Sequence, residues 1–154
     1  MMEMLLAHAI GDWLLQSQYM ASMKVRSAVP ALLHVTVYGI VYWVLVGPSW
    51  LALVVIVGTH YLIDRYRLAR HVNWAANFIA PVHWVKVERD HPWALDEFGP
   101  RPFKRLRSTN PPWSECSTYG SPPGVPDHIA FIVMIAVDQI LHLVLNWAAL
   151  RWLG

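Results

Sequence analysis

Apolar residues fill four stretches of the chain, and polar segments separate them. Each stretch is close to the roughly 20 residues with which a helix crosses a hydrocarbon core. Short connections join the first three stretches, whereas a long segment from 70 to 127 precedes the last. The pattern predicts an all-α fold with one membrane domain, a four-helix transmembrane bundle whose long loop lies between helices 3 and 4. The predicted spans are about 2–20, 29–46, 50–68 and 129–150.

The long segment divides into two parts. Its first part, "HVNWAANFIAPVHWVKV" at 71–87, spaces aromatic residues as in a helix lying on a membrane surface. The remainder is rich in proline and charge and includes "RPFKRLR" at 101–107, which indicates an irregular basic loop. We interpret this basic run as an anchor to anionic membrane lipids. No nucleic-acid-binding module accompanies it, so we expect no specific nucleic-acid partner.

Composition supports the membrane assignment. Hydrophobic residues make up 56% of the chain and charged residues 14%, with a mean hydropathy of +0.35, which is too apolar for an ordinary soluble domain. Nine tryptophans and six tyrosines suit a protein with two lipid–water interfaces. The single cysteine, Cys116, excludes an intrachain disulfide and any cysteine-based metal site.

Positive charge is confined almost entirely to one predicted side. Lys24 and Arg26 follow the first stretch, and nine further Lys and Arg residues lie between 65 and 107. The opposite side carries only Arg151. Because basic loops stay in the cytoplasm, we expect the long loop to be cytoplasmic and both termini to lie outside a bacterial inner membrane.

Seven ionisable side chains fall well inside the apolar stretches, where each aspartate costs roughly 2.5–3.5 kcal/mol on insertion scales. No lysine or arginine lies well inside a predicted span. Three His–Asp pairs have a four-residue spacing, which places both side chains on one helix face. A bound cation would compensate the buried carboxylates. The seven predicted metal ligands are His8, Asp12, His34, His60, Asp64, Asp138 and His142.

The ligand types indicate the metal. Neutral imidazole and carboxylate bind divalent ions such as zinc, iron and manganese, and we expect zinc first. A helix rises about 1.5 Å per residue, so the seven side chains overlap in depth, and their number suits one or two ions. Two-metal sites are common in hydrolases. Other polar residues are expected beside the ligands (Gln16, Gln139) or in helix packing (Tyr38, Tyr42, Asn146).

The segments "LLAHAIGDWLLQSQYMASMK", "LLHVTVYG", "THYLIDRYR" and "VDQILHLVLNW" resemble a family of small bacterial and phage membrane proteins, domain of unknown function 3307. The resemblance covers roughly 1–69 and 128–150, and the long loop exceeds the length usual in that family, so no role for it is implied. A looser, fold-level likeness links the His–Asp spans to predicted membrane-bound metal-dependent hydrolases. The matching positions are His8, Gly11, Asp12, Gln16, His34, His60, Asp64, Asp138, Gln139 and His142.

Three functions fit these observations. The first is a metal-dependent hydrolase that uses Asp12 or Asp64 as general base on a lipid or other membrane-embedded, phosphorylated substrate. The second is a metal-ion or proton transporter that uses the same residues as a pathway. The third is a non-catalytic phage membrane protein, related to exclusion or lysis, in which these residues fix helix packing. A site open to one side favours an enzyme, and a polar path to both faces favours transport. The oligomeric state, a homo-oligomer included, stays open.

Overall fold

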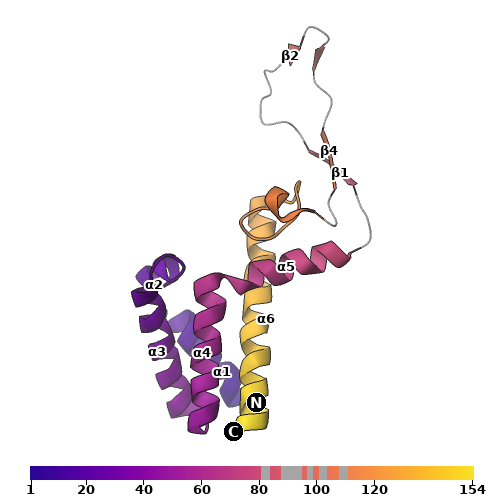
Figure 1. The fold of residues 1–154 in the computed structure, drawn as a ribbon. Coiled ribbons are helices and arrows are strands. Elements are labelled where there is room, and N and C mark those ends of the chain that lie inside the picture. The colour runs from indigo at the N-terminus through magenta and orange to yellow at the C-terminus, as the bar shows by residue number, and fades with distance from the viewer. Residues whose placement is uncertain (81–83, 88–94, 97–98, 101–103, 108–110) are drawn as a thin grey trace. The chain divides into compact units, whose positions relative to one another are not determined.

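A computed structural model gives the fold, and helices account for most of the described part of the chain (Figure 1). The chain forms two compact units. The first combines Met1–Ala69 with Ala136–Gly154, and the second covers Arg70–Ile135. The structure describes residues 1–80, 84–87, 95–96, 99–100, 104–107 and 111–154.

The first predicted span is not one helix. It comprises α1 (Met2–Ala9), a π-helical turn (Ile10–Leu14) and, after a break, α2 (Gln18–Met23). The break ends at Ser17, whose backbone is extended and whose side chain accepts a hydrogen bond from the backbone N–H of Met20, 3.2 Å away. Ser17 thereby satisfies a free amide at the start of α2. The expectation of a continuous helix over 2–20 is therefore corrected.

The second and third predicted spans are α3 (Ala28–Val46) and α4 (Trp50–Tyr66), which pack as a hairpin. Gly47 ends α3 in the left-handed conformation, with φ of 62°, which glycine adopts without steric cost. The Ser49 hydroxyl then accepts the amide of Ala52 at 3.1 Å and caps α4. The short connection expected between these two stretches is confirmed.

The fourth predicted span is the long helix α6 (Asp127–Leu153), whose part from Ala136 onward belongs to the first unit. An apolar core joins α1, α3, α4 and this part of α6. It contains Met4, Ala7, Tyr38, Val41, Tyr42, Ile56 and Ala149.

The second unit contains α5 (Leu68–Ile79) from Arg70 onward, a short 3₁₀ turn (Trp113–Glu115) and the start of α6. Two side chains of α5 bind the segment before α6. The amide of Asn73 donates to Ser121 Oγ at 3.0 Å, and the Trp74 indole donates to the carbonyl of Pro111 at 3.0 Å. A helix is therefore present in this part of the chain, but it ends at Ile79, and its location on a membrane surface stays a prediction.

Two short antiparallel ladders lie in the long segment; their first strand falls at the end of the range expected as a surface helix, and the other strands fall in the part expected to be irregular. Strand β1 (Trp84–Val87) pairs with β4 (Lys104–Arg107), and β2 (Leu95–Asp96) pairs with β3 (Gly99–Pro100). The predicted helical architecture is confirmed, and the two small ladders are an addition that the hydropathy pattern did not predict. The lipid-anchor role predicted for 101–107 concerns side chains outside the described part of the chain.

Two of the helices in the described residues are long and apolar enough to cross a membrane. These are α3, with 19 residues, and α6, with 27. Helix α4 has 17 residues, and the N-terminal segment is broken by the π turn. The structure therefore gives two candidate spans where the hydropathy pattern predicted four.

Candidate metal centre

Asp12 lies on the π-helical turn, where the amide of Leu15 bonds to the carbonyl of Ile10 at 2.9 Å. Such turns insert one extra residue into a helix and occur often at functional sites. The preceding residue is Gly11, and a Cβ atom there would lie only 2.7 Å from Cδ2 of Tyr38 on α3. The absence of a side chain at Gly11 lets the turn approach α3 closely, and this approach brings the Asp12 carboxylate to the site.

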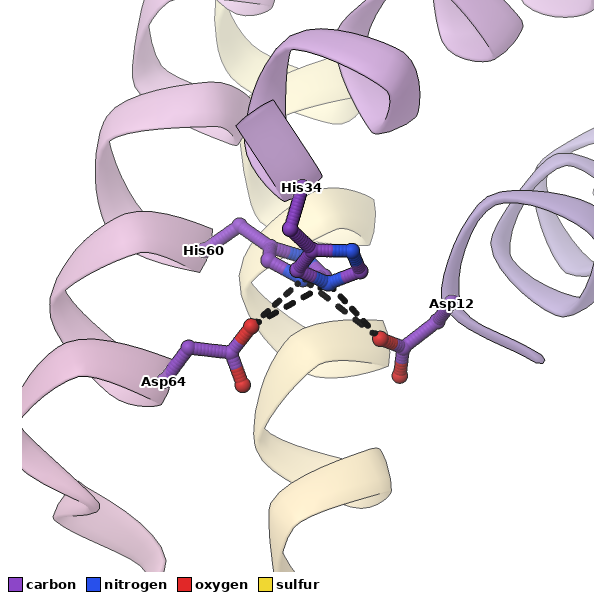
Figure 2. Close-up of side chains that lie close together, drawn as sticks. All are labelled: Asp12, His34, His60 and Asp64. Carbon is purple, nitrogen blue, oxygen red and sulfur yellow. Dashed lines mark hydrogen bonds and ion pairs between the residues drawn. The ribbon is translucent and has the colours of Figure 1, made fainter. Parts of the chain in front are cut away.

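Four buried side chains from three elements converge on one point, and we call Asp12, His34, His60 and Asp64 the quartet (Figure 2). His34 comes from α3, and one turn of α4 supplies both His60 and Asp64. Each side chain is at most 4% exposed. Figure 2 shows the two carboxylates on opposite sides of the paired imidazoles.

The spacing of the quartet matches a metal coordination shell. The two imidazole Nε2 atoms lie 3.0 Å apart. Asp64 Oδ2 lies 3.2 Å from each Nε2, and Asp12 Oδ1 lies 3.1 Å and 3.6 Å from those of His34 and His60. Ligand bonds of about 2.0–2.2 Å in tetrahedral geometry put neighbouring ligand atoms about 3.3–3.6 Å apart. The quartet can therefore surround one ion with little movement.

The protons of the quartet lead to the same conclusion. The Nε2 atoms of His34 and His60 lie 3.0 Å apart, so they cannot both carry a hydrogen directed at the other. If neither nitrogen carries a hydrogen, the two lone pairs face each other and also face the carboxylate oxygens of Asp12 and Asp64. A cation at the centre would accept all four lone pairs. The Nδ1 atoms of His34 and His60 are buried without a hydrogen-bond partner among the described residues, so nothing described there fixes the tautomer of either ring.

Lys24 corrects the expectation that no cationic side chain reaches the buried acids. It follows α2, outside every predicted span, yet its Nζ lies 2.8 Å from Asp64 Oδ1. The same ammonium donates to Gln16 Oε1 at 2.9 Å. The hydropathy pattern gave no signal for this contact, because the long lysine stem carries its charge from a polar turn into the bundle.

Asp138 and His142 of α6 form a second group with Asp64, and ligand atoms of all three lie within 4.8 Å of one another. His142 Nδ1 donates to the Asp138 backbone carbonyl at 2.8 Å. This bond leaves the lone pair on Nε2, which is buried and has no partner among the described residues. A ring nitrogen held in this way is typical of metal-binding histidines.

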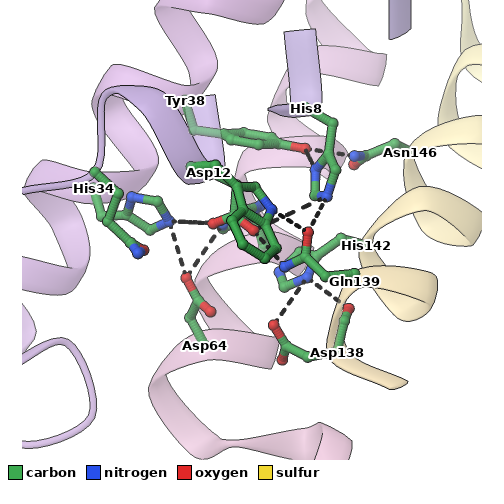
Figure 3. A network of polar contacts seen from close by, with 12 residues as sticks. His8, Asp12, His34, Tyr38, Asp64, Asp138, Gln139, His142 and Asn146 are labelled. Carbon is green, nitrogen blue, oxygen red and sulfur yellow. Dashed lines mark hydrogen bonds and ion pairs between the residues drawn. The ribbon is translucent and has the colours of Figure 1, made fainter. Parts of the chain in front are cut away.

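His8, a predicted ligand, lies outside both groups and belongs instead to a hydrogen-bond network (Figure 3). The Gln139 amide donates to Asp12 Oδ2 at 2.6 Å, so its oxygen is the acceptor for His8 Nε2–H at 2.8 Å and for the Trp13 indole at 2.7 Å. His8 Nδ1 then accepts from the Tyr38 hydroxyl at 2.8 Å. Both ring nitrogens of His8 are thus engaged, and the network fixes the Asp12 carboxylate.

Asn146, expected in packing, extends this network. Its amide donates to the hydroxyls of Tyr38 at 2.6 Å and Tyr42 at 2.8 Å. The Tyr42 hydroxyl in turn donates to the carbonyl of Met4 at 3.2 Å. These residues therefore combine packing with a continuous set of hydrogen bonds that leads to Asp12.

The predicted ligands thus divide into two classes. Six of the seven lie in the two overlapping groups, and His8 supports them. Of the carboxylates expected to act as general bases, Asp12 has both oxygens hydrogen-bonded, to His34 and to Gln139. Asp64 Oδ1 pairs with Lys24, and its Oδ2 lies 3.2 Å from the imidazoles without a hydrogen-bond partner among the described residues. Asp138 is the carboxylate of the site whose side chain is more exposed, at 19%.

Comparison with known proteins gives one match. A family model described as "Protein of unknown function (DUF3307)" matches residues 1–84, which contain the whole quartet and Lys24. No curated protein and no solved structure matches the chain.

Proposed function

We propose that this chain, which belongs to the DUF3307 family of proteins of unknown function, is an integral-membrane, metal-dependent hydrolase. The observation that carries the proposal is the convergence of two imidazoles and two carboxylates in a buried position, with the spacing of ligands around one ion. The proposed membrane region comprises four membrane-embedded segments, with α4 and the broken N-terminal segment beside α3 and α6.

The distribution of polarity in the first unit supports a membrane location. His34, His60 and His142 are at most 1% exposed, whereas large apolar side chains on the same helices face outward. In water, contiguous exposed apolar surface of this kind is unfavourable, but it suits contact with lipid. The exposed residues include Leu32, Ile40, Trp43 and Val44 of α3, Leu51, Val54 and Leu62 of α4, and Ile140, Val144 and Trp147 of α6.

Charge balance supports one divalent ion. With neutral histidines, Asp12, Asp64 and Asp138 bring three negative charges, and Lys24 offsets one of them. The remaining two negative charges in a buried site require compensation. One divalent cation in the quartet would supply it.

Coordination number bears on the identity of the metal. Four protein ligands complete a tetrahedral zinc shell and leave no open position. A six-coordinate ion such as manganese or iron(II) would keep two positions for water and substrate. We therefore propose a six-coordinate ion in the active form, and zinc would occupy the same ligands without supporting turnover.

Asp138 is the general base that we propose. A bound divalent ion acidifies water and polarises a phosphoryl oxygen. Asp138 would take a proton from the attacking water as the new oxygen–phosphorus bond forms. The bond between phosphorus and the ester oxygen would break, and the leaving oxygen would take a proton from solvent water. The position of Asp138 among the described residues fits this role, because both Asp12 oxygens are hydrogen-bonded and Asp64 Oδ1 pairs with Lys24.

Access to the quartet favours an enzyme over a transporter. Lys24 and Asp138 are partly exposed, at 15% and 19% of their side chains. In the other direction along α3, Tyr38 and Tyr42 are fully buried within the apolar core. A site reached from one side suits hydrolysis of a substrate at the membrane surface, and Lys24 would attract a phosphate group there.

The test uses detergent-purified protein loaded with Mn²⁺ or Zn²⁺ and mixed micelles containing phosphatidic acid or a polyprenyl diphosphate. We expect release of inorganic phosphate with Mn²⁺, and none from the Asp138→Asn variant, which keeps the quartet. Metal binding without phosphate release from either lipid, together with metal uptake by reconstituted vesicles, would replace the hydrolase with the transporter.

A further inference from the structure

The geometry points to a second metal site, formed by Asp64, Asp138 and His142, which Lys24 keeps free of metal. We propose that Lys24 thereby limits the wild-type protein to one divalent ion. This inference rests on the metal centre proposed above, because Asp64 belongs to both groups.

His142 is the first part of the argument. Its side chain is 1% exposed, and its Nε2 atom has no hydrogen-bond partner among the described residues. The opposite nitrogen donates to the Asp138 carbonyl, which fixes the tautomer in the form that binds metals. His142 therefore offers a buried, oriented lone pair without a hydrogen-bond partner, and it belongs to one group with the carboxylates of Asp64 and Asp138.

Asp64 connects the two sites. Its Oδ2 faces His34 and His60 of the quartet, both at 3.2 Å. Its other oxygen, Oδ1, contacts the Lys24 ammonium at 2.8 Å. A carboxylate that bridges two ions offers one oxygen to each, as in two-metal centres whose ions lie about 3.5–4 Å apart. Lys24 therefore binds the oxygen that a second ion would need.

Electrostatic repulsion prevents the Lys24 ammonium and a second divalent ion from occupying this place together. A divalent ion between Asp64 and Asp138 would lie next to the ammonium group in a site of low dielectric constant, where like charges repel strongly. With Lys24 present, one ion neutralises the three carboxylates. A second ion would leave two uncompensated positive charges, so it binds only when the ammonium withdraws or is removed.

The Lys24 ammonium is held in a defined place. Gln16 accepts its second hydrogen bond, at 2.9 Å, and the lysine stem starts from the turn after α2. By occupying this place, Lys24 leaves Asp138 uncoordinated, as a general base must be. Lys24 thus determines the metal stoichiometry of the site.

The experiment measures Mn²⁺ bound per chain at equilibrium, by elemental analysis and by electron paramagnetic resonance, which distinguishes single ions from coupled pairs. We expect one ion in wild type and two, with a coupled-pair spectrum, in Lys24→Met. Affinity at the second site should rise at least about 100-fold. Lys24→Arg, which keeps the charge, and Arg26→Gln, which removes an exposed charge nearby, should each bind one ion.

The double variant Lys24→Met/Asp138→Asn should return to one ion, which places the second ion on Asp138. Circular dichroism and thermal unfolding verify that each variant is folded, and Lys24→Gln provides a second neutral substitution should Lys24→Met not fold. One ion in both neutral variants, or two in wild type, would overturn the proposal while leaving the quartet intact. No bound metal in any variant would overturn the proposed metal centre itself.

Discussion

The Nε2 atoms of His34 and His60 lie 3.0 Å apart, although the two residues belong to different helices. Each atom also lies within 3.2 Å of Asp64 Oδ2. A single cation at this position would contact both Nε2 lone pairs and the carboxylate oxygen together. This relationship supports the proposed metal centre and leads to the following predictions.

Removal of an imidazole from the quartet should abolish metal binding. His60→Ala deletes a ligand at the centre of the site, so the loss of affinity should exceed the about 10- to 100-fold typical of changes to residues that only support the ligands. Elemental analysis after equilibrium dialysis measures the effect. The exposed His128 supplies the control, because His128→Ala should keep full metal content. Equal metal content in the two variants would contradict the site.

Loss of the Gln139 amide should weaken metal binding without abolishing it. Gln139→Leu removes the hydrogen bond to Asp12 Oδ2, and the loss of such a supporting contact should lower affinity about 10- to 100-fold. Competition with a metal-sensitive dye measures the dissociation constant. Gln18→Leu, at an exposed position, should bind as wild type does. An unchanged constant in Gln139→Leu would show that Asp12 needs no such support.

A methyl group at Gly11 should destabilise the first unit. The added Cβ would lie 2.7 Å from Tyr38 Cδ2, and overpacking of this kind costs about 1–3 kcal/mol. Because the π turn carries Asp12, metal affinity should fall as well. Gly58→Ala is the matched control, since a Cβ added there would meet no atom within 4 Å and alanine favours a helix by about 0.5–1 kcal/mol. Thermal unfolding of both variants in detergent measures their stability. A melting temperature equally unchanged in both would contradict the prediction.

Metal removal should lower the stability of the wild-type protein. An ion that binds only the folded state, at 100 times its dissociation constant, stabilises that state by about 2.7 kcal/mol. Addition of a chelator should therefore lower the apparent melting temperature, and Mn²⁺ should restore it. His60→Ala should show no difference between the two conditions. A chelator effect of equal size in that variant would place the ion elsewhere.

The natural cysteine reports the proposed membrane orientation. Cys116 lies in the long loop, which we expect in the cytoplasm, so an impermeant maleimide should label it only after spheroplasts are permeabilised. A variant with Cys116→Ser and Pro48→Cys moves the thiol to the turn between α3 and α4, and intact spheroplasts should label it. Labelling of Cys116 in intact spheroplasts would reverse the orientation.

The apolar stretches and their buried acids could be predicted from sequence because hydropathy is a local property. A long apolar run predicts a helix wherever it packs, and α3 and α6 follow their predicted ranges within three residues. The i,i+4 spacing of His60 and Asp64 likewise places both on one face of any regular helix. The prediction of one continuous helix over 2–20 was wrong, because the π turn and the break before Ser17 depend on tertiary contacts such as that of Gly11 with Tyr38.

The sequence by itself determined which ionisable residues lie among apolar ones and which pairs share a helix face. Only the tertiary structure decided which atoms meet: it placed His8 in the support of Asp12, gave both Asp12 oxygens a hydrogen-bond partner, and brought Lys24 to Asp64. The physical reason is that hydropathy and periodicity act along one helix. Coordination and ion pairing depend instead on the rotation of neighbouring helices and on the reach of flexible side chains, which no local pattern encodes.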